Sequence, residues 1–200
     1  MSTNAKEMGC KFIDPIIRDI RHLLPRKGSY PALKSDKLNK VVVHHAAGGD
    51  GVSGDIEETV KYLKGIAKMH MKPGHLSAGG APEIAYAFVI GANGMIYKTG
   101  SILSARWHSG NKAVNNSSVA IMLLGNLHNH PPTEQALEAL RYLVSLLCRF
   151  YPVTEVGGHR DYRATACPGQ WLDLKRFSVD RDKPPTAAQL RSKIKVAKQV

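Results

Sequence analysis

The chain is poor in cysteine and has no long apolar run. Its 200 residues include three cysteines, Cys10, Cys148 and Cys167, an odd and sparse set that argues against a disulfide framework and favours a reducing compartment. No apolar run approaches the roughly 20 residues that span a bilayer, so we do not expect an integral membrane protein. The first ten residues lack an apolar core and a small-residue cleavage site. We therefore expect synthesis in the cytoplasm without a cleaved signal peptide.

Acidic residues are also scarce. The 16 aspartates and glutamates face 28 lysines and arginines, which gives a net charge of +12. A field of one sign attracts polyanions, so the composition predicts an anionic partner such as nucleic acid, a membrane surface or an acidic wall polymer. The chain has no helix-turn-helix pattern, no RNA-binding aromatic signature and no finger-spaced Cys and His set. We therefore expect no specific nucleic-acid partner.

The length suits one domain with short appendages. Residues 1–39 are expected to form a basic extension with a short amphipathic helix packed on the domain. That helix is predicted because apolar residues follow Asp14-Pro15 at helical spacing, namely Ile16, Ile17, Ile20, Leu23 and Leu24. Residues 40–178 are expected to form the main domain. Residues 179–200 are expected to form a basic helical tail, which is either a contact for an anionic wall polymer or a membrane surface or a solvated decoration.

Strand and helix patterns alternate along the main domain. The predicted strands are 40–45, 84–90, 95–98, 118–125 and 154–158, and the predicted helices are 56–70 and a segment that begins after Thr133 and ends before Pro152. Asn93-Gly94 predicts a hairpin between the second and third strands. The pattern indicates an α/β fold with α+β character, a single domain with a central mixed β-sheet flanked by helices.

A candidate zinc site combines the segment from Gly158 to Gly169 with the end of the first predicted strand. His159 and Cys167 offer an imidazole and a thiolate, and His44 offers a third ligand. A catalytic zinc ion typically has three protein ligands and an open position for water. Adjacent side chains of a strand point to opposite faces, so only one of His44 and His45 reaches a given metal ion. A histidine at a strand end is by itself more often structural than a ligand.

Several segments, taken together and in order, resemble the zinc-dependent N-acetylmuramoyl-L-alanine amidases, the family of short bacteriophage endolysins and peptidoglycan recognition proteins. The resemblance runs from about Val41 to Phe177. It is carried by Val42-Val43-His44-His45, Tyr86 within Ile84–Ile90, Asn93-Gly94, Trp107-His108, Ser118–Asn126, Gly158–Asp161 and Thr165–Gly169.

The resemblance implies that His44, His159 and Cys167 bind Zn²⁺, and that the protein hydrolyses the amide between N-acetylmuramic acid and L-alanine of peptidoglycan. It implies catalytic roles for Tyr86, which faces the metal, and for Thr165, two residues before the cysteine ligand. Both are candidate donors to the oxyanion of the tetrahedral intermediate.

Three further residues are expected to line the substrate groove: His45, Trp107 and His108. His108 is also a candidate hydrogen-bond partner of a metal ligand, which metal-bound histidines usually require. His45 is the better candidate for packing or hydrogen bonding away from the metal.

The chain departs from its relatives at two positions. Some phage members have lysine where this chain has Thr165, as the recognition-protein branch does, so the electrostatic support for an oxyanion is smaller here. Members that recycle the cell wall in the cytosol have a glutamate base on the strand where this chain has Met122. Methionine cannot accept a proton, and the sequence does not name another general base.

The sequence is compatible with three functions. The first is a monomeric zinc amidase, a phage or prophage endolysin that is made in the cytoplasm and acts on the wall after release. The second is a peptidoglycan-binding protein on the same scaffold without catalysis. The third makes Cys167 a nucleophile with His159 as its base. Retention of all three ligands and Tyr86 favours the first, because a protein that only binds has no need of them.

Overall fold

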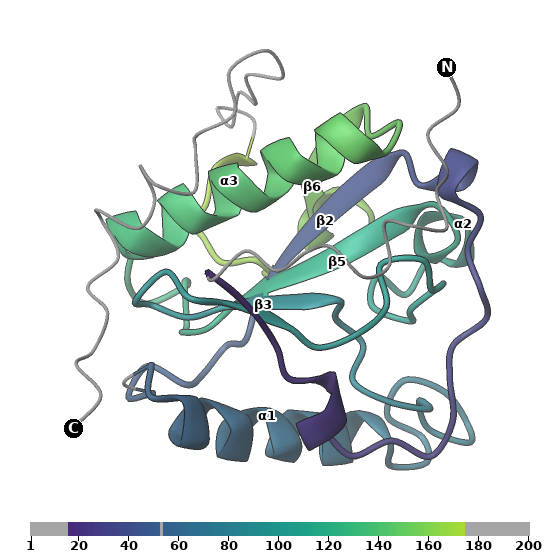
Figure 1. Cartoon of the computed structure of the whole chain (residues 1–200), viewed down its shortest axis with the longest axis horizontal. Helices are drawn as coiled ribbons and strands as arrows, with labels where there is room; N and C mark the ends of the chain where they lie inside the picture. Colours follow the sequence, from purple (N-terminus) through teal and green to yellow (C-terminus); the bar gives the residue numbers. More distant parts are fainter. Residues whose placement is uncertain (1–15, 53, 175–200) are drawn as a thin grey trace.

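The computed structural model describes residues 16–52 and 54–174. Its centre is a six-stranded mixed sheet with the order β1-β4-β3-β5-β2-β6. The strands are β1 (Ile17–Asp19), β2 (Lys40–His45), β3 (Phe88–Ile90), β4 (Ile96–Lys98), β5 (Ser118–Leu123) and β6 (Glu155–Gly158). The helices are α1 (Ile56–His70), α2 (Lys112–Asn115) and α3 (Glu134–Phe150), with short 3₁₀ turns η2 (Arg21–Leu23), η3 (Ser35–Lys37) and η4 (His159–Asp161). The helices α1 and α3 lie on opposite sides of the sheet (Figure 1), which confirms the predicted fold class.

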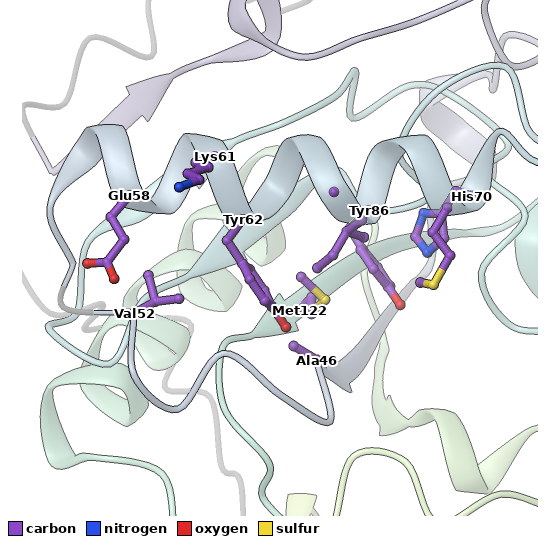
Figure 2. Close-up of a pocket in the computed structure, with 11 residues that line it drawn as sticks. Ala46, Val52, Glu58, Lys61, Tyr62, His70, Tyr86 and Met122 are labelled. Atoms are coloured by element: carbon purple, nitrogen blue, oxygen red, sulfur yellow. The ribbon is translucent and has the colours of Figure 1, made fainter.

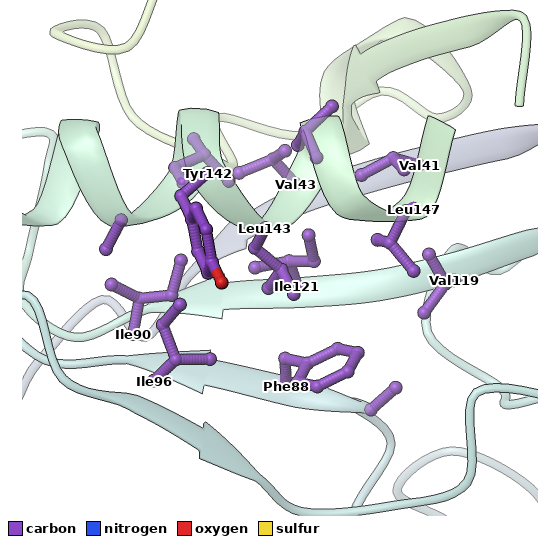
Figure 3. Packing of buried hydrophobic residues seen from close by; sticks show 14 of the residues in the cluster. Val41, Val43, Phe88, Ile90, Ile96, Val119, Ile121, Tyr142, Leu143 and Leu147 are labelled. Carbon is purple, nitrogen blue, oxygen red and sulfur yellow. The ribbon is translucent and has the colours of Figure 1, made fainter. Parts of the chain in front are cut away.

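The alternation of side chains along the central strands divides the core into two layers. Val41 and Val43 of β2 face α3, where they pack in the larger apolar cluster with Leu143 and others (Figure 3). Met122 of β5 belongs to the second cluster, which lies between the sheet and α1. His44 is paired in register with Met122, so its side chain also points to the α1 side.

Both long helices begin as the sequence predicts. The side chain of Asp55 accepts hydrogen bonds from the amides of Glu57 and Glu58 at the start of α1. Thr133 accepts a hydrogen bond from the amide of Ala136 at the start of α3. These side chains satisfy amides that have no partner within the helix. The short helix α2 was not predicted.

The prediction of a helix over residues 16–24 is wrong. Ile17–Asp19 forms strand β1, parallel to Ile96–Lys98, and only Arg21–Leu23 turns as a 3₁₀ helix. The apolar residues do not form one helical stripe, because Ile17 packs in the α3-side cluster and Ile20 in the α1-side cluster. Strand pairing with a distant segment therefore prevailed over the local spacing.

The segment before β2 is tied closely to the rest of the chain. The Lys27 ammonium donates hydrogen bonds to the carbonyls of Met71 (2.9 Å) and Gly79 (2.6 Å), at the two ends of the long loop after α1. The end of this loop is held by an ion pair of 2.7 Å between Glu83 and the buried guanidinium of Arg106. Residues 16–39 therefore contribute both a strand of the sheet and a support for this loop.

Some of the sequence predictions concern residues outside the ranges 16–52 and 54–174 that the structure describes. The start of the expected helix at Asp14-Pro15, residue Phe177 and the expected helical tail 179–200 all lie outside the described residues. Within residues 16–52 and 54–174, no helix is both long enough and apolar enough to cross a membrane. The apolar residues Trp171, Leu174 and Phe177 predict a short packing segment after the Cys167 loop, but Trp171 is 53% exposed, whereas Leu174 is buried.

Candidate metal centre

The sheet brings the three predicted ligands to one edge. β2 and β6 run parallel with Val43 opposite Gly158, so the next residues along each strand, His44 and His159, lie side by side. Their ring centroids are 4.6 Å apart. The loop after η4 returns Cys167 to the same place, and one ligand atom from each residue lies within 4.8 Å of the others.

The spacing of these atoms fits a tetrahedral zinc ion. The Cys167 Sγ atom lies 3.6 Å from Nδ1 of His44. Bond lengths of about 2.3 Å to sulfur and about 2.0–2.1 Å to nitrogen, at a tetrahedral angle, place these two atoms about 3.6 Å apart. Two imidazoles and one thiolate are also a donor set that zinc prefers. The three side chains therefore suit Zn²⁺, in agreement with the prediction.

A chain of hydrogen bonds determines which nitrogen of His44 is free. The Ser118 hydroxyl donates to the carbonyl of Val114 (2.6 Å), so its oxygen accepts the Nε2–H of His108 (3.0 Å). Nδ1 of neutral His108 is then an acceptor, and Nε2–H of His44 donates to it over 3.0 Å. The lone pair of His44 Nδ1 is left facing Cys167. His108 thus orients a candidate ligand, the role that the sequence suggested for it.

His159 is oriented in a similar way. Its Nε2 lies 3.1 Å from the carbonyl oxygen of Ser109, which can only accept, so Nε2 carries the proton. Nδ1 of His159 is therefore free for a metal ion. Asp161 supports this turn, because its carboxylate accepts a hydrogen bond of 2.7 Å from the amide of Gly158. From the sequence alone, Asp161 fits either a loop-orienting carboxylate or a plain turn residue, and this hydrogen bond favours the first role.

The electrostatics of the site favour neutral imidazoles. Burial lowers the pKa of His44 well below its usual range, and the neighbouring His108 and His159 lower it further. Burial also lowers the pKa of His159. Both rings are therefore neutral at pH 7, the state in which histidine binds metals.

The same surroundings disfavour a cysteine nucleophile. Burial raises the pKa of Cys167 to about 11, although the His45 amide and Arg160 act in the opposite direction. A nucleophilic pair needs a thiolate beside an imidazolium, and here both groups are shifted toward their neutral forms. A bound cation, in contrast, deprotonates a thiol that coordinates it.

Tyr86 lies beside His44 and Thr165 beside Cys167, two of the candidate ligands. The Tyr86 ring centroid is 5.2 Å from that of His44. Burial, with a further contribution from Cys167, raises the pKa of Tyr86 far above its usual range, so its hydroxyl stays protonated and can donate a hydrogen bond. The exposed Thr165 accepts a hydrogen bond of 3.3 Å from the amide of Cys167, which leaves its own hydroxyl proton available.

A pocket of 680 Å³ extends from Tyr86 along α1 (Figure 2). Its lining is mostly apolar and includes Met122, with Glu58 and Lys61 at the end nearer the start of the helix and His70 at the other end. Mostly apolar pockets with a few polar groups are typical ligand sites. Met122 therefore borders the pocket beside His44, where it can contribute packing but no proton transfer.

His70 is a site residue that the sequence analysis missed. Its Nδ1 accepts a hydrogen bond of 3.1 Å from the amide of Ala85, so the proton of the neutral ring is on Nε2. Burial lowers its pKa to about 4. The ring packs against Tyr86, with 5.5 Å between centroids. The available signal was a histidine on the buried face of an otherwise apolar helical pattern, seven residues after Leu63.

The other two predicted groove residues are placed differently. Nδ1 of buried His45 accepts a hydrogen bond of 3.1 Å from the amide of Leu127, on the face of β2 opposite to His44, as expected for the histidine that does not bind metal. Trp107 packs edge-on against Tyr30 with 5.3 Å between ring centroids. None of the three predicted groove residues, His45, Trp107 and His108, lines the pocket along α1.

A family model for N-acetylmuramoyl-L-alanine amidase matches residues 34–170, which is more than half of the chain. The chain belongs to the N-acetylmuramoyl-L-alanine amidase family. The match includes every predicted ligand, and it confirms the resemblance drawn from the motifs. Proteins similar to this amidase-family chain include amidases and peptidoglycan-recognition proteins.

Three known proteins illustrate the similarity. A peptidoglycan-recognition protein of Drosophila melanogaster is 35% identical over 107 residues, which cover 51% of this chain and 58% of that protein. The amidase LysC of Clostridium intestinale has a similar fold, with a TM-score of 0.61 and 23% identity over 80% of this chain and 92% of its own. Another Drosophila recognition protein, LB, was solved as a mutant in complex with tracheal cytotoxin. Its structure matches with a TM-score of 0.68 and 24% sequence identity, over 82% of this chain and 95% of its own. The chain thus spans little more than half the length of the first of these relatives.

Proposed function

We propose that this protein hydrolyses the amide bond between N-acetylmuramic acid and the L-alanine of peptidoglycan, with zinc held by His44, His159 and Cys167. The observation that carries the proposal is the 3.6 Å approach of Cys167 Sγ to a His44 nitrogen whose lone pair is directed by His108. A protein that only binds its ligand has no use for such an arrangement. Membership of the amidase family supports the choice of substrate.

Zinc bound by three such ligands supplies a Lewis acid and lowers the pKa of a coordinated water molecule. The residues of the chain have separate tasks. His44 and His159 are held as neutral rings, and the protonated Tyr86 hydroxyl donates to the negative charge that develops on the amide oxygen. Thr165 is a second donor. It brings no positive charge, so its contribution is smaller than that of a lysine.

We place the peptide stem of the substrate in the pocket along α1. The pocket begins at Tyr86, beside the metal ligands, and its volume of 680 Å³ suits several residues of a peptide. The Nε2–H of His70 offers a neutral donor to a peptide carbonyl at this end. Tracheal cytotoxin, a fragment of peptidoglycan, is bound by the relative LB, which supports a peptidoglycan ligand here.

Chelation tests the proposal. Purified protein is incubated with peptidoglycan before and after treatment with a zinc chelator, and again after zinc is added back. We expect amide cleavage to be lost with the chelator and restored by zinc. Cleavage that persists without zinc contradicts the zinc mechanism and supports the Cys167 nucleophile. Binding of peptidoglycan without any cleavage, with zinc bound, identifies the protein as a recognition protein.

We also place the protein in the endolysin class, active on the wall after release from the cytoplasm. Its net charge of +12 supports this, because bacterial walls and their polymers are anionic. Expression in the cytoplasm of a bacterium tests it. We expect no lysis until an agent permeabilises the inner membrane, and rapid lysis afterwards. Lysis without the agent, or none with it, contradicts the endolysin role.

A further inference from the structure

The solvent-facing side of α1 carries a row of lysines. Lys61, Lys64 and Lys68 follow one another at spacings of three and four residues, so they share one face of the helix. Lys72 continues the row just after the C-cap residue Met71. All four side chains are exposed. From Lys61 to Lys68 the row spans about 10 Å, at about 1.5 Å per residue.

Lys64, Lys68 and Lys72 of this lysine row have no acidic residue within four positions along the chain, whereas Lys61 follows Glu57 and Glu58 by four and three residues. Within the part of the chain that the structure describes, no ion pair to any of the four lysines is found. The acidic residues of α1, Glu57 and Glu58, are confined to its first turn. The helix α3 differs, because its exposed Arg141 lies 3.4 Å from Glu134 and 3.8 Å from Glu138.

Helix stability does not account for the row. Positive charges stabilise the last turn of a helix through the macrodipole, and the effect fades within that turn. This explains Lys68, which lies in the last turn of α1, and the i,i+4 spacing from Glu57 explains Lys61, but neither explains Lys64. Several like charges along one face also repel one another. The arrangement therefore indicates a partner that neutralises it.

The row borders the pocket along α1. Lys61 belongs to the lining of the pocket (Figure 2). Gly65 and Met69, four and eight residues later on α1, line it as well. A ligand that occupies the pocket therefore brings whatever is attached to it alongside the row. If the pocket holds the peptide stem, as the proposed function requires, the partner of the row is attached to the peptidoglycan.

We propose that the lysine row binds a linear phosphodiester polymer that is linked to the bacterial wall. A row about 10 Å long suits anions that repeat along a chain better than one isolated anion. The location of the polymer beside the pocket rests on the proposed function. Its negative charge is inferred separately, from the positive charge of the row.

Two other polyanions fit less well. A membrane surface is bound by helices whose apolar face is free to enter the lipid, but the apolar face of α1 is buried against the sheet through Leu63 and Ala67. Nucleic-acid strands without sequence preference are bound by aromatic platforms beside basic groups. The exposed positions of the row and its neighbours Gly65 and Met69 include no aromatic side chain.

Binding to isolated walls tests the inference. Walls that carry a phosphodiester polymer are compared with the same walls after hydrofluoric acid has removed it. The test variant is Lys64→Gln, Lys68→Gln, Lys72→Gln, which leaves the pocket residue Lys61 intact. The matched control, Lys34→Gln, Lys37→Gln, Lys112→Gln, removes the same charge from exposed positions elsewhere. Circular dichroism and thermal melting verify that both variants are folded.

We expect the wild type and the control to bind the polymer-bearing walls more tightly than the stripped walls. The test variant is expected to lose about tenfold in affinity for the polymer-bearing walls only, and high salt is expected to abolish the difference. Equal binding by the test and control variants overturns the inference. The inference is also overturned if the test variant loses as much affinity for stripped walls. A larger loss of its affinity for duplex DNA or for vesicles of phosphatidylglycerol overturns it as well.

Cleavage of a soluble muropeptide without polymer separates this inference from the proposed function. The test variant is expected to cleave it at the wild-type rate. If the wild type cleaves no muropeptide but the polymer-dependent binding is as expected, the catalytic proposal fails and the lysine row stands. If cleavage occurs but binding ignores the polymer, only the inference about the row fails.

Discussion

Nδ1 of His108 lies 3.0 Å from Nε2 of His44, and this contact leaves the other nitrogen of His44 facing Cys167. Through this contact, buried His108 sets the orientation of His44, a proposed metal ligand. The tautomer of His108 is in turn set by its hydrogen bond to Ser118. The residues that orient the site therefore include one on strand β5.

Replacement of His108 by alanine therefore weakens zinc binding. We expect the affinity for zinc to fall about 10- to 100-fold, because the His44 ring loses the partner that sets its tautomer. Competition with a chromophoric chelator measures the affinity. His22→Ala, which removes an exposed histidine, is the control and is expected to bind zinc as the wild type does. Equal affinities in the two variants contradict the role of His108.

Cys167→Ser removes the thiolate ligand. Serine is a much poorer zinc ligand, so we expect stoichiometric zinc to be lost and amide cleavage to be abolished, with the far-ultraviolet circular dichroism unchanged. Metal analysis after gel filtration gives the zinc content. Cys148→Ser, on α3 away from the site, is the matched control. A Cys167→Ser protein that retains both zinc and activity contradicts the assignment of the ligand.

Tyr86→Phe separates catalysis from metal binding. The variant loses only a hydroxyl, so we expect zinc content and melting temperature to be retained while kcat falls about 100-fold. Steady-state kinetics on a soluble muropeptide provides the measurement. If kcat is unchanged, Tyr86 contributes packing against His44 and His70 but no transition-state stabilisation.

The buried His70 makes stability depend on pH. Its pKa is lowered by burial to about 4, from 6.5 in the unfolded chain, so the unfolded state binds the proton more readily between these values. The contribution of His70 is therefore complete above pH 6.5 and is lost as the pH falls toward 4. Its full size is on the order of 3 kcal/mol.

His70→Asn tests this dependence, because asparagine keeps an acceptor for the amide of Ala85 without titrating. Urea unfolding is measured at pH 7 and at pH 4.5 for both proteins. We expect the free energy of unfolding of the wild type to decrease more than that of the variant between these two pH values. Parallel decreases show that other groups cause the pH dependence.

Much of the fold and the ligand set could be predicted from the sequence, because the signals are local or belong to a recognisable order of motifs. The apolar run before His44, the Asn93-Gly94 turn and the Thr133 cap each specify a local geometry. The alternation of a strand also predicted that His44 and His45 point to opposite faces. Their observed partners, His108 and Leu127, agree with it.

The errors have long-range causes. Ile17 pairs with β4 about 80 residues later, and no local spacing reveals a strand whose partner is so distant. His70 lies within a helical pattern, and only its contact with Ala85 across a long loop shows that it belongs to the site. The sequence alone indicates that the lysines share one face of a helix. Only the structure shows that this face borders the pocket.

Mass spectrometry of digested peptidoglycan tests the central claim most directly. Zinc-loaded wild type and Cys167→Ser are incubated with the same purified peptidoglycan, and the soluble products are identified. We predict that the wild type releases peptides with a new free L-alanine N-terminus and that Cys167→Ser does not. New reducing sugar ends, new ends between residues of the peptide, or the same products from both proteins would contradict a zinc amidase.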